Sequence, residues 1–244
     1  MNPYNYEHIR YAVKIRYLWK DKPELKNADV LIFHCPFDCA LLDYLDKPSI
    51  LYEHRAGRPN TFMFKIIMKE AYDPLHRYLM ERDNKKVLKI LKELFHKPDV
   101  VICNSKFIKN QLKKWFGRDA YVVYPPVDLK VFRPMERERK YFLSIQRINW
   151  QKRIDVQLKA FEGLKEKLLV VGPGHEDLMK YLTKDMPNVE YLGEVKEKEL
   201  VELINGAKAV IQTGYFEDFG LVPVEAMACG IPSIVVDEGG FKET

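Results

Sequence analysis

The feature that most constrains this fold is the alternation of short β-branched runs with longer helical patterns along the chain. Nine runs read as strands, at residues 29–34, 49–54, 100–105, 120–125, 141–146, 168–172, 189–194, 209–214 and 232–237. Strands separated by helical segments are typical of parallel α/β sheets. The first four strands and the last five strands belong to different halves of the chain. We therefore predict two successive α/β domains.

Two helical stretches and one break in the pattern complete this outline. Residues 62–96 read as helix, and a second helix from about residue 152 carries one apolar stripe, made by Ile154, Leu158, Phe161 and Leu164. Residues 123–141 interrupt the alternation with a Pro-Pro pair, a further proline and a run of charges, which is typical of a connection between domains. We place the boundary near 134–139, so residues 1–135 form the first Rossmann-like domain and residues 136–244 the second.

Composition places the chain among soluble globular proteins, because 47% of its 244 residues are hydrophobic and 31% are charged. The net charge of +5 suits a partner that carries phosphates or an anionic membrane, and demonstrates neither. The sequence contains no signal-peptide pattern and no apolar run near the roughly 18 residues of a membrane span. Four unpatterned cysteines favour buried thiols in a reducing compartment. We therefore expect a cytoplasmic protein.

Two glutamates in the stretch "EDFGLVPVEAMACG" are the strongest indication of a binding site. Glu217 lies in the loop after the strand that ends near Gly214, and Pro223 suits the first turn of the helix that follows. We place Glu225 in that first turn. Free N–H groups at residues 219–222 would bind an anion at the helix N-terminus. The two carboxylates would then accept hydrogen bonds from hydroxyl groups on either side of a diphosphate, although a loop acid and a glutamate near a helix start are also common surface features.

A second loop on the same edge of the sheet supplies the opposite charge. Arg147 ends the strand 141–146, and Lys152 opens the next helix. An arginine fork and a lysine point charge together suit a diphosphate, although 40 lysines and arginines make such a pair weak evidence alone. Gly172 and Gly174 in "VGPGHED" form a glycine-rich turn that would let a ligand approach the backbone.

At this point the chain resembles the carboxy-terminal domain of retaining glycosyltransferase family 4. The resemblance rests on "SIQRINWQKRID", "VGPGHE", "YLGEV" and "EDFGLVPVEAMACGIPSIVVDEGGFKE", with "NSKFIKNQLKKWFG" and "VVYPPVDLKVFRP" upstream, and it covers residues 29–244. It implies the glycosyltransferase B-type fold, with two Rossmann-like domains that face each other across a cleft. It also implies transfer of a mannose-type or glucose-type hexose from a GDP- or UDP-linked donor to a glycan or lipid-linked acceptor, with retention of anomeric configuration.

The resemblance also implies roles for individual residues. Arg147 and Lys152 would hold the diphosphate, Glu217 the sugar hydroxyls and Glu225 the ribose, while Val195 would border the base. The backbone that would contact sugar and phosphate belongs to Phe219, Gly220, Leu221 and Val222. No cofactor is implied beyond the donor substrate, and the lack of an Asp-x-Asp motif fits a metal-independent reaction. Nucleic acid is not an expected partner.

In the first domain the resemblance places His54 close to the transferred sugar, although a histidine at a strand end is more often a structural hydrogen-bonding group. His34 has a weaker claim, and a metal site of His34, Cys35 and Cys39 would have only three ligands on one apolar element. The helix 106–116 presents an apolar face and a lysine face. Packing under the first domain is the preferred interpretation, and peripheral docking to the inner face of an anionic membrane is the alternative.

Relative to the family pattern, we expect the first domain to lack the usual first strands, and the second to lack the usual last strand and closing helices. This expectation leaves two functions open. The first is a hexosyltransferase, and the alternative is a non-catalytic relative that binds a nucleotide sugar or serves a full-length enzyme as a partner subunit. A sugar phosphorylase of the same fold is a third reading that no motif singles out.

Overall fold

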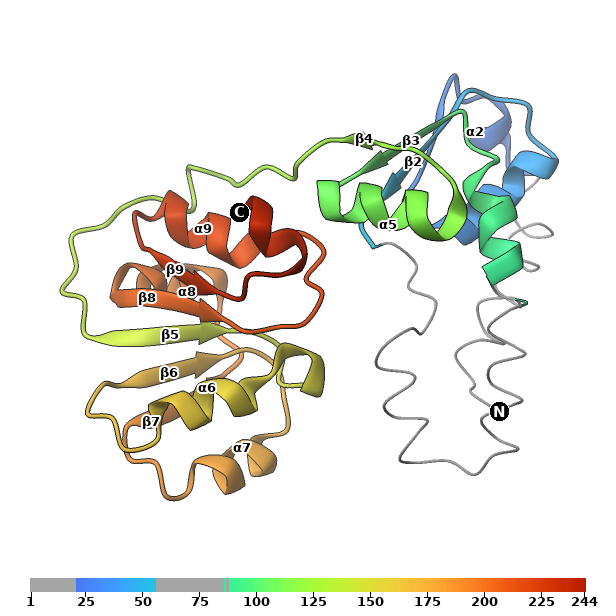
Figure 1. Cartoon of the computed structure of the whole chain (residues 1–244). Coiled ribbons are helices and arrows are strands. Elements are labelled where there is room, and N and C mark those ends of the chain that lie inside the picture. Colours follow the sequence, from blue (N-terminus) through green and yellow to red (C-terminus); the bar gives the residue numbers. More distant parts are fainter. Residues whose placement is uncertain (1–20, 56–85, 87) are drawn as a thin grey trace, which may run out of the picture. The chain divides into compact units, whose positions relative to one another are not determined.

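The computed structural model describes residues 21–55, 86 and 88–244, which belong to two compact units, Met1–Tyr124 and Pro125–Thr244 (Figure 1). Both units contain a parallel sheet, and all nine predicted strands are present. The two α/β units confirm the predicted fold class. Of the predicted helix 62–96, residues 62–85 and 87 lie outside the described residues, and residues 88–95 are helical.

The first unit is built on a four-stranded parallel sheet in the order β1-β2-β3-β4. Its strands are β1 (Leu31–Phe33), β2 (Ser49–Glu53), β3 (Val100–Cys103) and β4 (Tyr121–Val122). Its helical elements are α2 (Pro23–Lys26), the 3-10 helix η1 (Pro36–Asp43), residues 88–95 and α5 (Lys106–Phe116). Buried side chains of η1, residues 88–95 and α5 form one core with alternate residues of the strands. The described helical parts of the three crossovers therefore share one core with the sheet.

Helix α5 shows why the sequence forms this layer. The Ser105 Oγ accepts a hydrogen bond from the N–H of Ile108, and Gly117 ends the helix in the left-handed conformation. Ile108 and Phe116 are completely buried in the core of the first unit. The apolar face thus packs inside the first unit, as the preferred interpretation predicted, and the lysine face stays at the surface.

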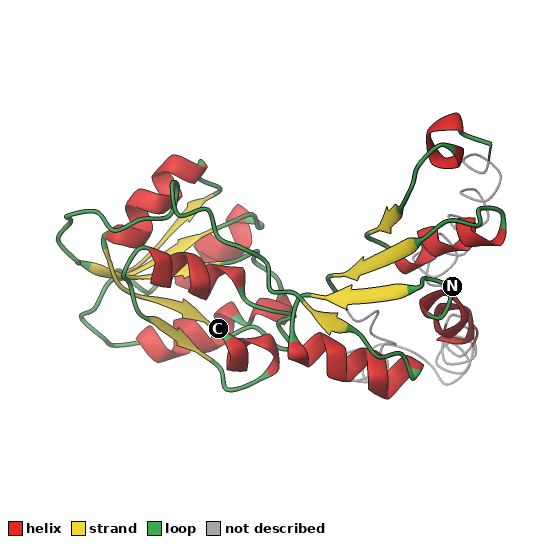
Figure 2. Ribbon diagram, turned by 90° about the horizontal axis from the view of Figure 1, so that it is seen from above, coloured by secondary structure: helices red, strands yellow, loops and turns green. Residues whose placement is uncertain are grey.

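The second unit is built on a five-stranded parallel sheet in the order β7-β6-β5-β8-β9, with helices on both faces (Figure 2). Its strands are β5 (Tyr141–Ile145), β6 (Leu168–Val171), β7 (Val189–Gly193), β8 (Ala207–Gln212) and β9 (Ser233–Val235). Its helices are η2 (Trp150–Lys152), α6 (Ile154–Phe161), α7 (Glu176–Thr183), α8 (Glu197–Asn205), α9 (Leu221–Ala228) and η3 (Gly239–Glu243). All four residues of β6 are buried, as expected for a parallel strand covered on both faces.

Two separate cores flank this sheet. Helices α6 and α7 contribute to one core, and α8 and α9 contribute to the other. Three residues of the predicted α6 stripe are buried, but Leu164 is 49% exposed. The prediction for Leu164 was wrong because α6 ends at Phe161, so the helical period no longer applies there.

The connection between the units joins the second one. The side chain of Phe132 is buried in the core shared by α8 and α9. The Asn205 Oδ1 accepts a hydrogen bond from the N–H of Met135, and its Nδ2 donates to the carbonyl of Arg133. The structure therefore divides the chain after Tyr124, whereas the sequence placed the boundary after residue 135. Proline content marked the connection, but contacts distant in sequence decide which unit it joins.

Among the described residues, no helix has the length and apolar character needed to cross a bilayer. All four cysteines are free thiols, three of them buried and Cys35 half-buried, as the sequence predicted.

Candidate functional site

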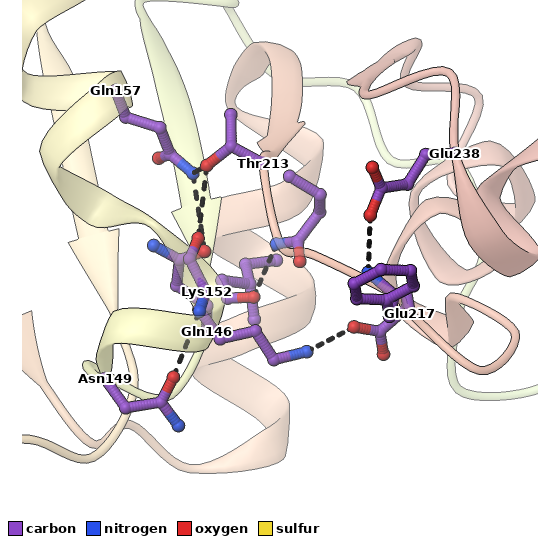
Figure 3. Close-up of polar contacts among 10 residues, drawn as sticks. Gln146, Asn149, Lys152, Gln157, Thr213, Glu217 and Glu238 are labelled. Carbon is purple, nitrogen blue, oxygen red and sulfur yellow. Dashed lines mark hydrogen bonds and ion pairs between the residues drawn. The ribbon is translucent and has the colours of Figure 1, made fainter. Parts of the chain in front are cut away.

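The loops that follow β5, β6, β7 and β8 leave the second sheet at one edge, because parallel strands share the edge at which they end. Lys152 and Glu217 belong to two of these loops and form an ion pair. The Lys152 Nζ lies 2.6 Å from the Glu217 Oε2, and about three quarters of each side chain is buried (Figure 3). The structure thus brings together two predicted site residues that are 65 positions apart in sequence.

Backbone contacts hold these two loops together beside the ion pair. The N–H of Tyr215 donates to the carbonyl of Gln151 at 2.9 Å. The Thr213 Oγ1 lies 3.2 Å from the carbonyl oxygen of Lys152 and 3.0 Å from that of Arg153 (Figure 3). The guanidinium of Arg153 lies over the Tyr215 ring, 4.1 Å from its centroid, as in a cation–π contact. Lys152 and Glu217 are therefore held in place by several contacts besides their own.

Two amides complete a buried polar network under these loops. Gln157 of α6 is 1% exposed, and its Nε2 donates to the Thr213 Oγ1 at 2.9 Å and to the Gln146 Oε1 at 3.4 Å (Figure 3). Neither glutamine was singled out from the sequence. The available signal was the position of three polar residues: Gln146 and Thr213 directly follow β5 and β8, and Gln157 lies on the buried face of α6.

Backbone strain lies at the same place. Arg153 and Phe216 are the two described residues other than glycine with positive φ, at 53° and 50°. One directly follows Lys152, and the other directly precedes Glu217. Such conformations cost roughly 1–3 kcal/mol for residues other than glycine and collect at ligand sites.

Arg147 lies two residues beyond the end of β5 and is exposed. Among the described residues it makes no hydrogen bond or ion pair, so its guanidinium is available to a ligand. Lys152, by contrast, already neutralises a carboxylate. The two cations predicted to act alike therefore differ, one being open and the other paired.

The glycine-rich turn after β6 is closely packed against the β5 loop. A Cβ at Gly172 would lie 2.1 Å from the carbonyl oxygen of Gln146, and the φ of Gly172 is 131°. A Cβ at Gly174 would lie 2.4 Å from that of Ile148. Both positions thus require glycine because of protein contacts. Gly174 also lines a cavity of about 350 Å³, together with Pro173, Glu194 and other residues. Val195 directly follows Glu194 in the sequence and packs half-buried against the core.

A downstream segment supports the loop that contains Glu217. The N–H of Gly240 donates to the carbonyl of Glu217 at 2.7 Å. The Glu238 Oε1 accepts from the N–H of Phe216 at 2.8 Å (Figure 3). A Cβ at Gly240 would lie 2.5 Å from the Cα of Phe219. In the sequence, Glu238 and Gly240 were noted only as part of the stretch "EDFGLVPVEAMACGIPSIVVDEGGFKE", and no role was assigned to them. In the structure they define the path of the loop.

Helix α9 begins directly after this loop. Gly220 precedes it with a φ of 97°, and no side chain caps its N-terminus. The first N–H groups of any helix, here those of Leu221 and Val222, have no partner within the helix. Leu221 is 44% exposed, whereas Phe219 is buried. The turn thus leaves backbone N–H groups without an intrahelical partner four residues after Glu217, as the predicted anion site requires.

Glu225 does not lie where the sequence placed it. It is the fifth residue of α9 and belongs to the second turn, because the helix begins at Leu221 and contains no acidic residue in its first turn. The side chain is half-buried, and burial, with a smaller effect of Glu197, raises the pKa of this carboxyl group. Proline at 223 marked the helix start correctly but not its exact first residue.

In the first unit, His54 directly follows β2 and contacts His34, which directly follows β1. The His34 Nδ1 and the His54 Nε2 are 3.1 Å apart. Burial and then His34 lower the pKa of His54. The described part of the chain contains no cluster of three or more metal-ligating side chains, including at His34, Cys35 and Cys39, which the sequence had already made a poor candidate for a metal site.

Comparisons with known proteins identify the family and the fold. The family model for glycosyltransferase family 4 matches residues 1–131, and that for glycosyl transferases group 1 matches residues 129–244. The α-1,3/1,6-mannosyltransferase ALG2 of Saccharomyces cerevisiae is 24% identical over 87% of this chain and 49% of its own length. The GDP-Man:Man(3)GlcNAc(2)-PP-Dol α-1,2-mannosyltransferase of Dictyostelium discoideum is 28% identical over 59% of this chain and 35% of its own length. The chain thus spans at most about half the length of these relatives.

Solved structures show the same fold. Sucrose-phosphate synthase from Thermosynechococcus elongatus is similar with a TM-score of 0.73 and 17% identity, covering 100% of this chain and 63% of its own. Anabaena HepE, solved with UDP and glucose, is similar with a TM-score of 0.70 and 17% identity, covering 96% and 64%. The architecture is therefore of the glycosyltransferase B type, and the chain belongs to glycosyltransferase family 4.

Proposed function

We propose that this chain transfers a hexose, of the mannose or glucose type, from a GDP- or UDP-linked donor to a glycan or lipid-linked acceptor, with retention of anomeric configuration. The contact between Lys152 and Glu217 carries this proposal most directly. It joins a cation for the diphosphate to a carboxylate for hydroxyl groups, beside the N-terminus of α9. The mannosyltransferase names of the relatives and the UDP and glucose in HepE support a hexose donor.

The proposed reaction depends on positively charged and N–H groups near the phosphate on which negative charge develops. As the bond between sugar and diphosphate breaks, negative charge grows on the leaving phosphate. The exposed Arg147, Lys152 and the N–H groups of Leu221 and Val222 stabilise that charge. These groups supply the positive charge that a metal ion would otherwise provide, so we propose a metal-independent reaction. The leaving phosphate accepts the proton of the acceptor hydroxyl.

Two carboxylates and three backbone segments complete the donor site. Glu217 accepts hydrogen bonds from the sugar hydroxyls, and Glu225 accepts them from the ribose. The backbone at Phe219 and Gly220 contacts sugar and phosphate, while the turn at Gly172 and Gly174 and the segment at Val195 border the base. The cavity beside Gly174 supports this placement of the base. In the first unit, His54 contacts the transferred sugar.

Partners and location follow from this chemistry. The donor is a nucleotide sugar, and the acceptor is a glycan or a lipid-linked glycan; nucleic acid is not a proposed partner. A cytoplasmic enzyme that contacts the inner membrane face peripherally would meet both substrates. A non-catalytic relative, or a partner subunit of a full-length enzyme, would bind the donor without releasing nucleoside diphosphate.

The decisive experiment measures binding of GDP, UDP, GDP-mannose and UDP-glucose by calorimetry. Arg147→Ala with Lys152→Ala should abolish binding while the fold persists, since Arg147 is exposed and Lys152 belongs to neither hydrophobic core of the second unit. Binding equal to that of the parent would refute the diphosphate assignment.

A second variant separates the role of Glu217 from that of Lys152. Glu217→Gln releases the Lys152 Nζ from its carboxylate, so the bare diphosphate should bind at least as tightly as before. The nucleotide sugar should bind more weakly, because an acceptor of sugar hydroxyls is lost. Equal losses for both ligands would remove Glu217 from the sugar. Release of nucleoside diphosphate from the donor distinguishes the enzyme from the non-catalytic alternative.

A further inference from the structure

Two histidines at the carboxyl edge of the first sheet, His34 and His54, have the geometry of a directed hydrogen bond between their rings. The neighbouring parallel strands β1 and β2 end just before His34 and His54. The pleat places Tyr52 and His54 on one face of β2, where His34 approaches from β1. The Tyr52 ring meets the His54 ring edge-on, with centroids 4.6 Å apart.

The two imidazoles are joined end to end. Their planes differ by 16°, and their centroids are 5.4 Å apart, while the His34 Nδ1 and the His54 Nε2 are 3.1 Å apart. The centroid separation exceeds the N···N distance by about the sum of the two ring radii. Both nitrogen atoms therefore lie close to the line between the ring centres, within both planes, as a linear N–H···N hydrogen bond requires.

Other contacts hold the His54 ring in this position. The Asn104 Nδ2 donates to the carbonyl oxygen of His54 at 3.1 Å, which fixes its backbone. The Tyr52 hydroxyl donates to the carbonyl oxygen of Val123 at 3.2 Å, which fixes the ring beside it. Among the described residues, the Nδ1 of His54 has no hydrogen-bond partner, and the side chain is exposed. One nitrogen atom is thus engaged, and the other is open.

We propose that His34 is a positioning residue that accepts the Nε2–H of His54 and thereby presents the Nδ1 lone pair of His54 to a substrate hydroxyl group. This proposal rests on the proposed function, in which His54 contacts the sugar. A neutral imidazole in water prefers to carry its proton on Nε2. With this direction of the bond both rings keep that preferred form, whereas the reverse direction would put both rings in the less favoured form. The hydrogen bond of one ring nitrogen fixes the role of the other.

The direction of the bond can be observed without any substrate. In protein labelled with ¹⁵N-histidine at about pH 8, above the ordinary histidine pKa of about 6.5, the ring shifts report which nitrogen is protonated. We expect His54 to be protonated on Nε2, with a coupling across the hydrogen bond to the Nδ1 of His34. The variants of each histidine assign the signals. A His54 protonated on Nδ1, or a pair without the coupling, would overturn the proposal.

Activity then tests the positioning role. His34→Ala should lower kcat for release of nucleoside diphosphate from GDP-mannose or UDP-glucose by roughly tenfold or more, because the Nε2 of His54 loses the partner that fixes its proton and orients the ring. His34→Asn places an amide oxygen near the Nδ1 position, and it should restore kcat to within about threefold of the parent. Equal rates for both variants and the parent would refute the role. Absence of turnover in the parent would count against the proposed function, while the spectrum would still decide the direction of the bond.

Discussion

Replacing Thr213 by valine tests whether the polar network under the loops positions the ion pair. Valine keeps the shape of threonine but removes the hydroxyl that meets the carbonyls of Lys152 and Arg153 and accepts from Gln157. The Nε2 of Gln157, a side chain that is 1% exposed, would retain only its long contact to Gln146.

The size of the effect follows from these contacts. A buried donor left without a partner costs about 1–3 kcal/mol, so we expect the variant to lose about 2 kcal/mol of stability. A loss of this size lowers the Tm by roughly 4–8 °C for a chain of this length. Because the Lys152 backbone loses a tether, affinity for a nucleoside diphosphate should fall about fivefold, equivalent to about 1 kcal/mol.

Thermal unfolding and calorimetric titration with GDP and UDP measure the two effects. Thr213→Ser is the matched control, since it keeps the hydroxyl and loses only a methyl group. The serine variant should lose some stability but retain the affinity of the parent. If valine and serine gave the same Tm and the same affinity, the network would have no role in positioning Lys152.

Two further predictions concern a glycine and a carboxylate. Gly172→Ala should cost more than about 3 kcal/mol in denaturant unfolding, because a Cβ would lie 2.1 Å from the Gln146 carbonyl oxygen at a φ of 131°. Gly117→Ala, with open space around it, should cost only about 1–2 kcal/mol. Similar losses of stability for the two variants would refute the steric argument. The raised pKa of Glu225 means that the charged form of its carboxyl group is disfavoured in the folded state. The stability contributed by the protonated form is therefore present below the unfolded pKa and is lost as pH rises through the folded pKa. Glu225→Gln should therefore be more stable than the parent near pH 7 and lose that advantage near pH 4, around the ordinary glutamate pKa of about 4.3. A stability difference independent of pH would contradict burial and Glu197 as the causes of the raised pKa.

The sequence predicted the strands well because their signal is local. Each β-branched run, such as 168–172, contains the information that makes it a buried parallel strand. Helix ends were less certain: proline at 223 indicated the start of α9, but the position of Leu221 as its first residue moved Glu225 into the second turn. A helix start depends on backbone geometry that several neighbouring residues share.

Contacts between side chains could be predicted least. Lys152 and Glu217 were both chosen as ligand-binding residues, but nothing in either loop showed that they pair with each other. The network of Gln146 and Gln157 was missed because a buried amide is recognised only when its partner from another strand is known. Such pairs depend on tertiary structure, in which the strand order places β5 beside β8.

The two glycines after β9 have a consequence for biosynthesis. The loop that presents Glu217 receives a hydrogen bond from the N–H of Gly240, and it packs against Gly239 and Gly240 more closely than any side chain would allow. During synthesis, Arg147 and Lys152 leave the ribosome long before this segment does. A nascent chain that ends before Gly240 would therefore contain Arg147 and Lys152, the cations proposed to bind phosphate, without the completed loop. We expect donor binding to begin only after the ribosome has released residues 239–240, so that ligand capture waits for the segment that supports the Glu217 loop.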